Sequence, residues 1–284
     1  MNVECASDSA LVKRVHEEMA ALTRAHTVAI VAQYEGVPHQ HATGTLVRFA
    51  DQWLLVTASH AIKYYREGQE LYPDLHLLLE NGISSLIPLG GKYWATDRVN
   101  DRERPVFTPD GDLWDIALWS LDQATVRDLT NKSFLNRSDI SITAALTSGL
   151  YYVAGFPSVW GHPNIEDRTI NFGALGYIAN PHPCPTDLDG FDASSHIALS
   201  LSPSEEMPEL EGISGCSIWK ISDGPLGDDW TSKSAKVVAV QTGVYTKVAR
   251  KAVKGTKWSC VVRAMGLQFP ELRSSFDVWL PGRE

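Results

Sequence analysis

Short apolar segments rich in β-branched and aromatic residues recur along most of this 284-residue chain, separated by turn-forming residues. Such segments are typical of β-strands, and many of them at short spacing predict a sandwich or a barrel. No long helical pattern alternates with them, which disfavours a doubly wound parallel sheet. The chain is therefore predicted to be all-β. The candidate strands are 27–33, 42–49, 53–58, 75–79, 115–121, 150–155, 169–178, 196–201, 216–221, 237–245 and 258–263.

One helix is predicted before this β region. Between Ser9 and Arg24 the apolar residues recur at helical spacing, so we expect residues 1–26 to form an amphipathic helical extension that packs on the outside of the β region. The segment 122–147 has helix-compatible residues and few strand signals. We place a domain division there, which gives a first β domain over 27–130 and a second over 131–284, including a carboxy-terminal tail.

The net charge and the distribution of apolar residues disfavour two classes of binding partner, nucleic acids and membranes. The formal net charge is −9, so nucleic acid is not expected as a partner. No apolar run approaches the roughly 20 residues that span a bilayer, so no membrane partner is expected either. The first residues show neither the basic flank nor the apolar run of a secretory signal.

The cysteines point to a reducing compartment. Cys5, Cys184, Cys216 and Cys260 are scattered, with no C-x-x-C pair. That spacing argues against a zinc ribbon and against a dense disulfide framework. We therefore expect four reduced thiols, a cytoplasmic location, and no metal or other cofactor.

The segment Glu211-Gly212-Ile213-Ser214-Gly215-Cys216 places a serine on a tight turn between two glycines. Gly212 can take backbone angles that other residues avoid, and Gly215 leaves room for another part of the chain. The peptide N–H groups of such a turn can point at one spot and stabilise an oxyanion. Glycine–serine turns are common in loops, so this pattern needs a base and an acid elsewhere in the chain.

Two other residues supply candidates for that base and acid. His60 follows the apolar run Trp53–Ala58 directly, where it is either an ordered, accessible base or a histidine satisfied at a strand end. Asp115 leads into another apolar strand, and a carboxylate there is costly unless it is paired. Holding an imidazole tautomer would supply that pairing. Asp110 and Asp112 are more simply explained as turn residues.

These three elements occur in a recognisable order. They are Thr57-Ala58-Ser59-His60, Asp115-Ile116-Ala117-Leu118 and Gly212-Ile213-Ser214-Gly215. At this point residues 27–265 resemble the trypsin-like (chymotrypsin-fold) serine peptidases, of a bacterial intracellular type. Val153-Ala154-Gly155-Phe156-Pro157 is similar to a strand end of the glutamyl-endopeptidase-like and high-temperature-requirement members. The resemblance implies two packed six-stranded antiparallel β-barrels with an active site in the cleft between them.

It also implies roles for individual residues. Ser214 would be the nucleophile, His60 the general base and then acid, and Asp115 the group that orients His60. The N–H groups of Gly212 and Ser214 would form the oxyanion hole. The activity implied is that of a serine endopeptidase, a hydrolase that cleaves a protein or peptide through an acyl-enzyme.

Substrate contacts follow from the same resemblance. Gln241, Thr242 and Gly243 would pair with the substrate backbone as an added strand. Pro208, six residues before Ser214, would line the pocket for the side chain that precedes the cut. One of the glutamates around it could select Arg or Lys, although a solvated acidic loop explains them as well. Those glutamates are Glu205, Glu206, Glu209 and Glu211.

Two departures from the family pattern bear on regulation and chemistry. Ile213 stands where secreted trypsins carry the aspartate that pairs with a newly cut amino terminus, so control must come from the amino-terminal helix, a loop rearrangement or a partner protein. Cys216 stands where a small residue is usual, and we interpret it as a buried filler. We expect a restricted protein substrate, as in a bacterial regulatory or defence protease.

Three alternatives belong to other classes. An α/β-hydrolase elbow requires G-x-S-x-G, but Cys216 occupies the last position and the order of the triad residues is reversed. A metal hydrolase could use His39 and His41, but no further ligand has suitable spacing. A catalytically inactive, protease-like module that binds peptides in the same groove stays open.

Overall fold

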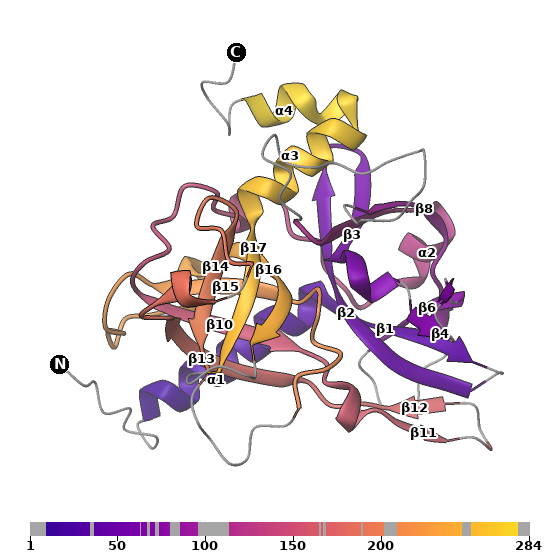
Figure 1. The fold of residues 1–284 in the computed structure, drawn as a ribbon, viewed down its shortest axis with the longest axis horizontal. Helices are drawn as coiled ribbons and strands as arrows, with labels where there is room; N and C mark the ends of the chain where they lie inside the picture. The colour runs from indigo at the N-terminus through magenta and orange to yellow at the C-terminus, as the bar shows by residue number, and fades with distance from the viewer. Residues whose placement is uncertain are drawn as a thin grey trace.

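The structure is a computed structural model in which two β units lie side by side, with helices at their margins (Figure 1). A helix crosses behind the units and two more helices cover one end. The structure describes residues 10–34, 37–62, 64–66, 69–71, 74–79, 86–95, 114–164, 166, 169–188, 190–201, 209–245 and 251–277.

The first β unit is a seven-stranded antiparallel sheet in the order β7-β6-β1-β2-β3-β9-β8. Its interior is filled by fully buried aliphatic side chains such as Ile30, Leu46, Leu55 and Leu77. Two further short strands, β4 and β5, form a separate hairpin. The strands are β1 (Thr27–Tyr34), β2 (Val37–Phe49), β3 (Gln52–Ala58), β4 (Tyr64–Arg66), β5 (Gln69–Leu71), β6 (Asp74–Leu78), β7 (Ile87–Pro88), β8 (Gly91–Ala95) and β9 (Ile116–Leu121).

The second β unit is a closed six-stranded barrel in the order β10-β13-β14-β17-β16-β15. Tyr151, Val153 and Ile218 are among the buried side chains inside it. A hairpin, β11–β12, extends from the barrel to contact β2 of the first unit (Figure 1). The strands are β10 (Leu150–Gly155), β11 (His162–Asn164), β12 (Thr169–Asn171), β13 (Leu175–Pro181), β14 (His196–Ser200), β15 (Ser217–Ser222), β16 (Lys236–Tyr245) and β17 (Ala252–Lys257).

The helices lie at the margins of the β units. Asp122 caps the start of α2, where its side chain accepts a hydrogen bond from the Thr125 N–H at 2.8 Å. The α-helices are α1 (Ala10–His26), α2 (Gln123–Asp128), α3 (Trp258–Gln268) and α4 (Arg273–Asp277). The 3₁₀ turns are η1 (Ser59–Ile62), η2 (Arg137–Asp139), η3 (Ser158–Trp160), η4 (Pro185–Asp187), η5 (Ser232–Ser234) and η6 (Pro270–Leu272).

One hydrophobic cluster joins the two β units. It contains Met19 of α1, Val47 of the first sheet, Trp219 and Val237 of the barrel, and Val261 of α3. The segment between β9 and β10, which connects the two units, also contacts both of them, because Leu135 pairs with β2 and Ile140 pairs with β16. The predicted boundary between 130 and 131 falls in this segment and stays a prediction.

The predicted fold class is confirmed. The chain is mainly β, it has an amino-terminal helix, and one of its units is the expected closed six-stranded barrel. The other unit is a curled sheet of seven strands, and no pairing that closes it is present among the described residues. No helix in the described part of the chain combines the length and apolarity needed to cross a membrane.

Two predicted strands differ from the structure. The segment 258–263 is not a strand but the start of α3, and the strand β17 comes before it. Trp258, Val261, Val262 and Met265 follow a helical repeat and are buried in the cluster between the units, so packing overrides the β propensity of these residues. The segment 169–178 contains two strands, β12 and the start of β13.

Candidate active site

His60 lies in the 3₁₀ turn η1, directly after strand β3. Its backbone N–H donates to Asp115 Oδ1 at 3.0 Å, and its ring Nδ1 lies 2.7 Å from Asp115 Oδ2. Two contacts to one carboxylate fix both the backbone and the ring of the histidine. The His60 side chain is 50% exposed, so the ring stays accessible from solvent.

Asp115 immediately precedes strand β9 and has a backbone φ of +53°. Such left-handed angles are uncommon for residues other than glycine, although aspartate tolerates them better than most. The Ser59 N–H donates to the Asp115 carbonyl at 3.0 Å, which ties the backbone to the turn that carries His60. The Asp115 side chain is only 15% exposed, and His60 supplies two of its hydrogen bonds.

The Ser214 turn packs tightly against the first sheet. Gly215 has a φ of +93°, and a Cβ there would lie 2.1 Å from both the Thr43 carbonyl oxygen and Thr57 Oγ1. Only glycine fits this position. Because the backbones approach so closely, the Thr43 N–H donates to the Ser214 carbonyl at 2.9 Å, and Thr43 Oγ1 donates to the Gly212 carbonyl at 2.9 Å.

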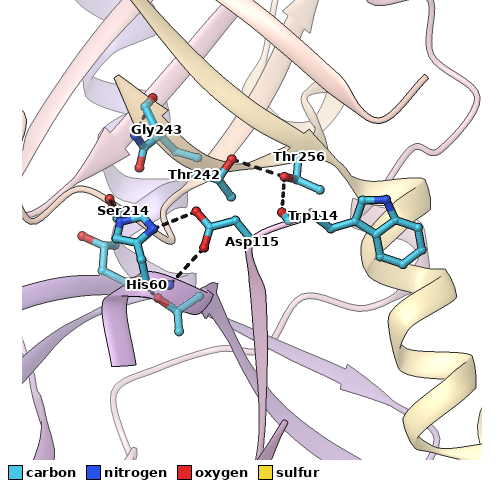
Figure 2. Close-up of polar contacts among 10 residues, drawn as sticks. His60, Trp114, Asp115, Ser214, Thr242, Gly243 and Thr256 are labelled. Carbon is cyan, nitrogen blue, oxygen red and sulfur yellow. Dashed lines mark hydrogen bonds and ion pairs between the residues drawn. The ribbon is translucent and has the colours of Figure 1, made fainter. Parts of the chain in front are cut away.

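The imidazole of His60 bridges Asp115 and Ser214 (Figure 2). The Ser214 Oγ lies 3.0 Å from His60 Nε2, on the side of the ring opposite to the carboxylate. A proton on Nδ1 that is donated to Asp115 leaves Nε2 as the acceptor for the serine hydroxyl. This arrangement can remove the hydroxyl proton as Ser214 Oγ attacks an electrophile.

Hydrogen bonds to two carbonyls of the Ser214 turn fix the orientation of the peptide groups that carry the Gly212 and Ser214 N–H. The Glu211 carbonyl accepts from the Ser158 N–H at 2.7 Å, and the Ile213 carbonyl accepts from the Cys216 N–H at 3.0 Å. In a trans peptide the N–H points opposite to the C=O, so the Gly212 and Ser214 N–H groups point away from these partners. Neither N–H makes a hydrogen bond within the described part of the chain.

The predicted substrate-binding residues lie partly beside this turn. Gln241, Thr242 and Gly243 belong to β16, and the Gln241 carbonyl accepts from the Gly215 N–H at 2.8 Å. Pro208 lies outside the described residues, as do Glu205 and Glu206. The other two glutamates of that segment, Glu209 and Glu211, are exposed.

The two departures from the family pattern are both buried. Ile213 is 1% exposed and packs in the barrel core, and Cys216 is fully buried. Burial raises the pKa of the Cys216 thiol well above its usual range, so the group is neutral and unreactive. Cys216 is thus the buried filler that the sequence predicts. No group of three or more potential metal ligands occurs within the described residues.

Sequence reasoning missed the threonines that join the two units at this site. Thr43 and Thr45 of β2 bond to the Ser214 turn, since Thr45 Oγ1 donates to the Gly215 carbonyl at 3.2 Å. Thr256 of β17 donates to the Trp114 carbonyl at 2.6 Å. Threonine is an ordinary strand residue, so no local signal marks these positions.

The two β units, with a histidine–aspartate pair on one and a glycine-flanked serine on the other, give the chain a chymotrypsin-like fold. No protein-family model and no curated protein sequence matches the chain. Among solved structures, it is similar to neuropsin, a serine protease expressed in the limbic system of mouse brain. The identity is 12% and the TM-score 0.48, over 83% of this chain and 90% of that one.

A second similar structure is the thermostable serine protease AL20 from an extremophilic microorganism. The identity is 12% and the TM-score 0.46, over 82% of this chain and 91% of that one. At this level of identity and overlap, both likenesses concern the overall course of the chain and carry no statement about chemistry.

Proposed function

We propose that this chain is a serine endopeptidase that hydrolyses peptide bonds of a protein substrate. The observation that carries the proposal is the position of the His60 ring, which lies 2.7 Å from Asp115 and 3.0 Å from Ser214. A buried or half-buried histidine with a purely structural role has no need of a serine hydroxyl at one ring nitrogen and a carboxylate at the other.

In the first half of the proposed reaction, Ser214 Oγ attacks the carbonyl carbon of the scissile bond. His60 Nε2 takes the hydroxyl proton, and Asp115 stabilises the imidazolium through Nδ1–H. The negative charge that develops on the carbonyl oxygen is stabilised by the N–H groups of Gly212 and Ser214. His60 then gives its proton to the leaving amine, the C–N bond breaks, and an acyl-enzyme is formed.

In the second half, water replaces the amine. His60 removes a proton from that water, whose oxygen attacks the acyl carbon, and then returns the proton to Ser214 Oγ as the ester bond breaks. The acid product leaves, and the enzyme regains its starting state. The half exposure of the His60 side chain is compatible with this step, because water can reach the ring.

The strand pairing of β16 supports a peptide as the substrate. Its register with β15 ends at Val240, whereas its register with β17 continues to Tyr245. The edge of Thr242 and Gly243 that follows Val240 therefore lies beside the Ser214 turn, where an extended peptide can add as a strand. We propose that Gln241, Thr242 and Gly243 bind the substrate backbone there.

Covalent labelling tests the proposed nucleophile. A fluorophosphonate probe should label wild-type protein at Ser214, and Ser214→Ala should abolish labelling and lower peptidase activity by about 10⁶-fold. Ser234→Ala, an exposed serine of η5, is the matched control and should label normally. Mass spectrometry of the labelled peptide identifies the modified residue.

Failure to label wild-type protein under any condition would contradict the proposal and favour an inactive peptide-binding module. The restricted substrate is a further part of the proposal, and rapid digestion of casein by the isolated chain would count against it. A regulatory partner, a role in bacterial defence and a cytoplasmic location stay predictions from the sequence.

A further inference from the structure

Two successive hydrogen bonds, made by buried threonine hydroxyls of the barrel, lead to the residue before Asp115 (Figure 2). Thr256 Oγ1 donates to the Trp114 carbonyl oxygen at 2.6 Å, and Thr242 Oγ1 lies 3.2 Å from Thr256 Oγ1. A hydroxyl has a single proton, and that of Thr256 is used on Trp114. The Thr242 hydroxyl must therefore donate to Thr256, so both hydrogen bonds run in the same direction, toward Trp114.

The accepting carbonyl belongs to the peptide group that joins Trp114 to Asp115. That group is planar, so its orientation relative to the Asp115 Cα is described by the φ of Asp115, which is +53°. A left-handed φ at a residue other than glycine costs on the order of 1–3 kcal/mol and persists only where its surroundings hold it. The hydrogen bond from Thr256 holds this peptide from the side of the barrel.

The Trp114 side chain is anchored on the same side. It is 1% exposed and lies in the hydrophobic cluster between the units, with the Arg263 guanidinium of α3 5.5 Å from its ring centroid. Both the ring and the carbonyl of Trp114 are therefore fixed by elements of the second half of the chain. Asp115 precedes a strand of the first sheet, but the peptide group in front of it is held by the unit that carries Ser214.

We infer that Thr256 is a positioning residue for the Asp115 carboxylate, and that Thr242 supports it by donating to its hydroxyl. This inference rests on the proposed function, because it assigns Thr256 a part in keeping the His60 ring aligned between Asp115 and Ser214. Thr256 is fully buried, and Thr242 is 4% exposed. Water therefore does not compete for the hydrogen bond to Trp114.

Substitution of Thr256 separates positioning from stability. Thr256→Val keeps the shape of the side chain and removes the hydroxyl, whereas Thr256→Ser keeps the hydroxyl. Thr125→Val is the matched control, because Thr125 is also buried and also donates to a backbone carbonyl, that of Pro88, away from the site. The probe is the fluorophosphonate, with the saturable binding constant and the maximal labelling rate measured separately for each variant.

We expect Thr256→Val to lower the maximal labelling rate by about 10- to 100-fold, with little change in the binding constant of the probe. Thr256→Ser should restore the rate to within a few-fold of wild type. Thr125→Val should lower thermal stability without changing the labelling rate. Equal labelling rates of folded Thr256→Val and wild type would overturn the inference.

A readout that needs no reaction distinguishes this inference from the proposed function. The proton on His60 Nδ1, shared with Asp115, should give a strongly deshielded proton NMR signal in wild type, in Thr256→Ser and in Thr125→Val. In Thr256→Val this signal should shift upfield or broaden. If wild type shows the signal but no labelling, the proposed function fails alone, and an unchanged signal in Thr256→Val contradicts the positioning role.

Discussion

At the scale of single residues, the backbone conformation of Asp115 determines much of the geometry of the candidate site. Its φ of +53° turns the carboxylate toward both the backbone N–H and the ring of His60. The neighbouring carbonyls of Trp114 and Asp115 accept from Thr256 and Ser59. A carboxylate with this many fixed neighbours reorganises little when a charge appears on the imidazole, which is what electrostatic support requires.

His196, a second buried histidine, is expected to make the protein sensitive to acid. Its pKa is lowered to about 4, chiefly by burial and then by the nearby charges of Lys254 and Lys257, while Asp192 and Asp115 act in the opposite direction. Its Nδ1 accepts from the Asp192 N–H at 3.1 Å, and its buried Nε2 has no hydrogen-bond partner among the residues that the structure describes. The folded protein therefore holds this ring neutral at pH values where an unfolded histidine is protonated.

The sign of the pH effect follows from these two states. Below pH 6.5 the unfolded chain binds a proton at His196, whereas the folded chain does not until about pH 4. The free energy of unfolding should therefore fall as the pH is lowered from 6.5 to about 4. The loss from this residue is up to about 3 kcal/mol. Urea denaturation of wild type and His196→Asn at pH 7 and pH 4.5 measures it, since the asparagine oxygen can still accept from Asp192.

His162→Asn, at an exposed histidine, is the control and should follow wild type. The same loss of stability in His196→Asn as in wild type would show that other groups cause the acid sensitivity. His16 and His26, whose pKa values are also lowered by burial, would then be the first to examine.

At the scale of elements, α1 acts as a clamp on the two β units. Its Val15 and Met19 side chains are fully buried in the cluster between the units. Its polar side chains reach the barrel, where Arg14 donates to the Asp228 carbonyl at 2.7 Å and Glu18 accepts from the Ser232 N–H at 2.9 Å. The helix is part of the core, and its predicted role in controlling activity stays a prediction.

Truncation of Met19 tests the clamp. Met19→Ala should lower the free energy of unfolding by about 2–5 kcal/mol, because it leaves a cavity where the helix meets both units. Lys13→Ala, on the exposed face of the same helix, should change it by less than about 0.5 kcal/mol. Urea unfolding gives both values, and equal stabilities of the two variants would show that α1 is only loosely attached.

At the scale of the whole molecule, the two β units are expected to unfold together. They share one buried cluster, and Thr45 Oγ1 lies 2.7 Å from Ser217 Oγ in a fully buried contact between them. Hydrogen exchange should therefore give the same free energy of opening for amides of β3 in the first sheet and of β17 in the barrel.

Two distinct free energies of opening for β3 and β17 would contradict this expectation and would indicate separable domains. The expectation matters for the site, because His60 and Asp115 lie on one unit and Ser214 on the other. A structure in which the units opened independently would separate the proposed nucleophile from its base.

The sequence carried enough information to select the three residues that meet at the candidate site, whose roles stay predictions. Glycines around Ser214, a histidine at a strand end and an aspartate before an apolar strand are local patterns, and each of them lies where the pattern placed it. It was less informative about elements whose state depends on packing. The segment after Lys257 has strand-forming residues but is a helix, because one helical face of it is buried between the units.

What the sequence determined by itself was therefore local: turn chemistry, strand alternation and the residue types of the site. The tertiary structure decided how these parts meet. Thr256 and Trp114 are 142 positions apart, and His60 and Ser214 are 154 apart. Contacts at such separations leave no periodic trace in a single sequence, because they exist only once the barrel is closed and the first sheet has packed against it.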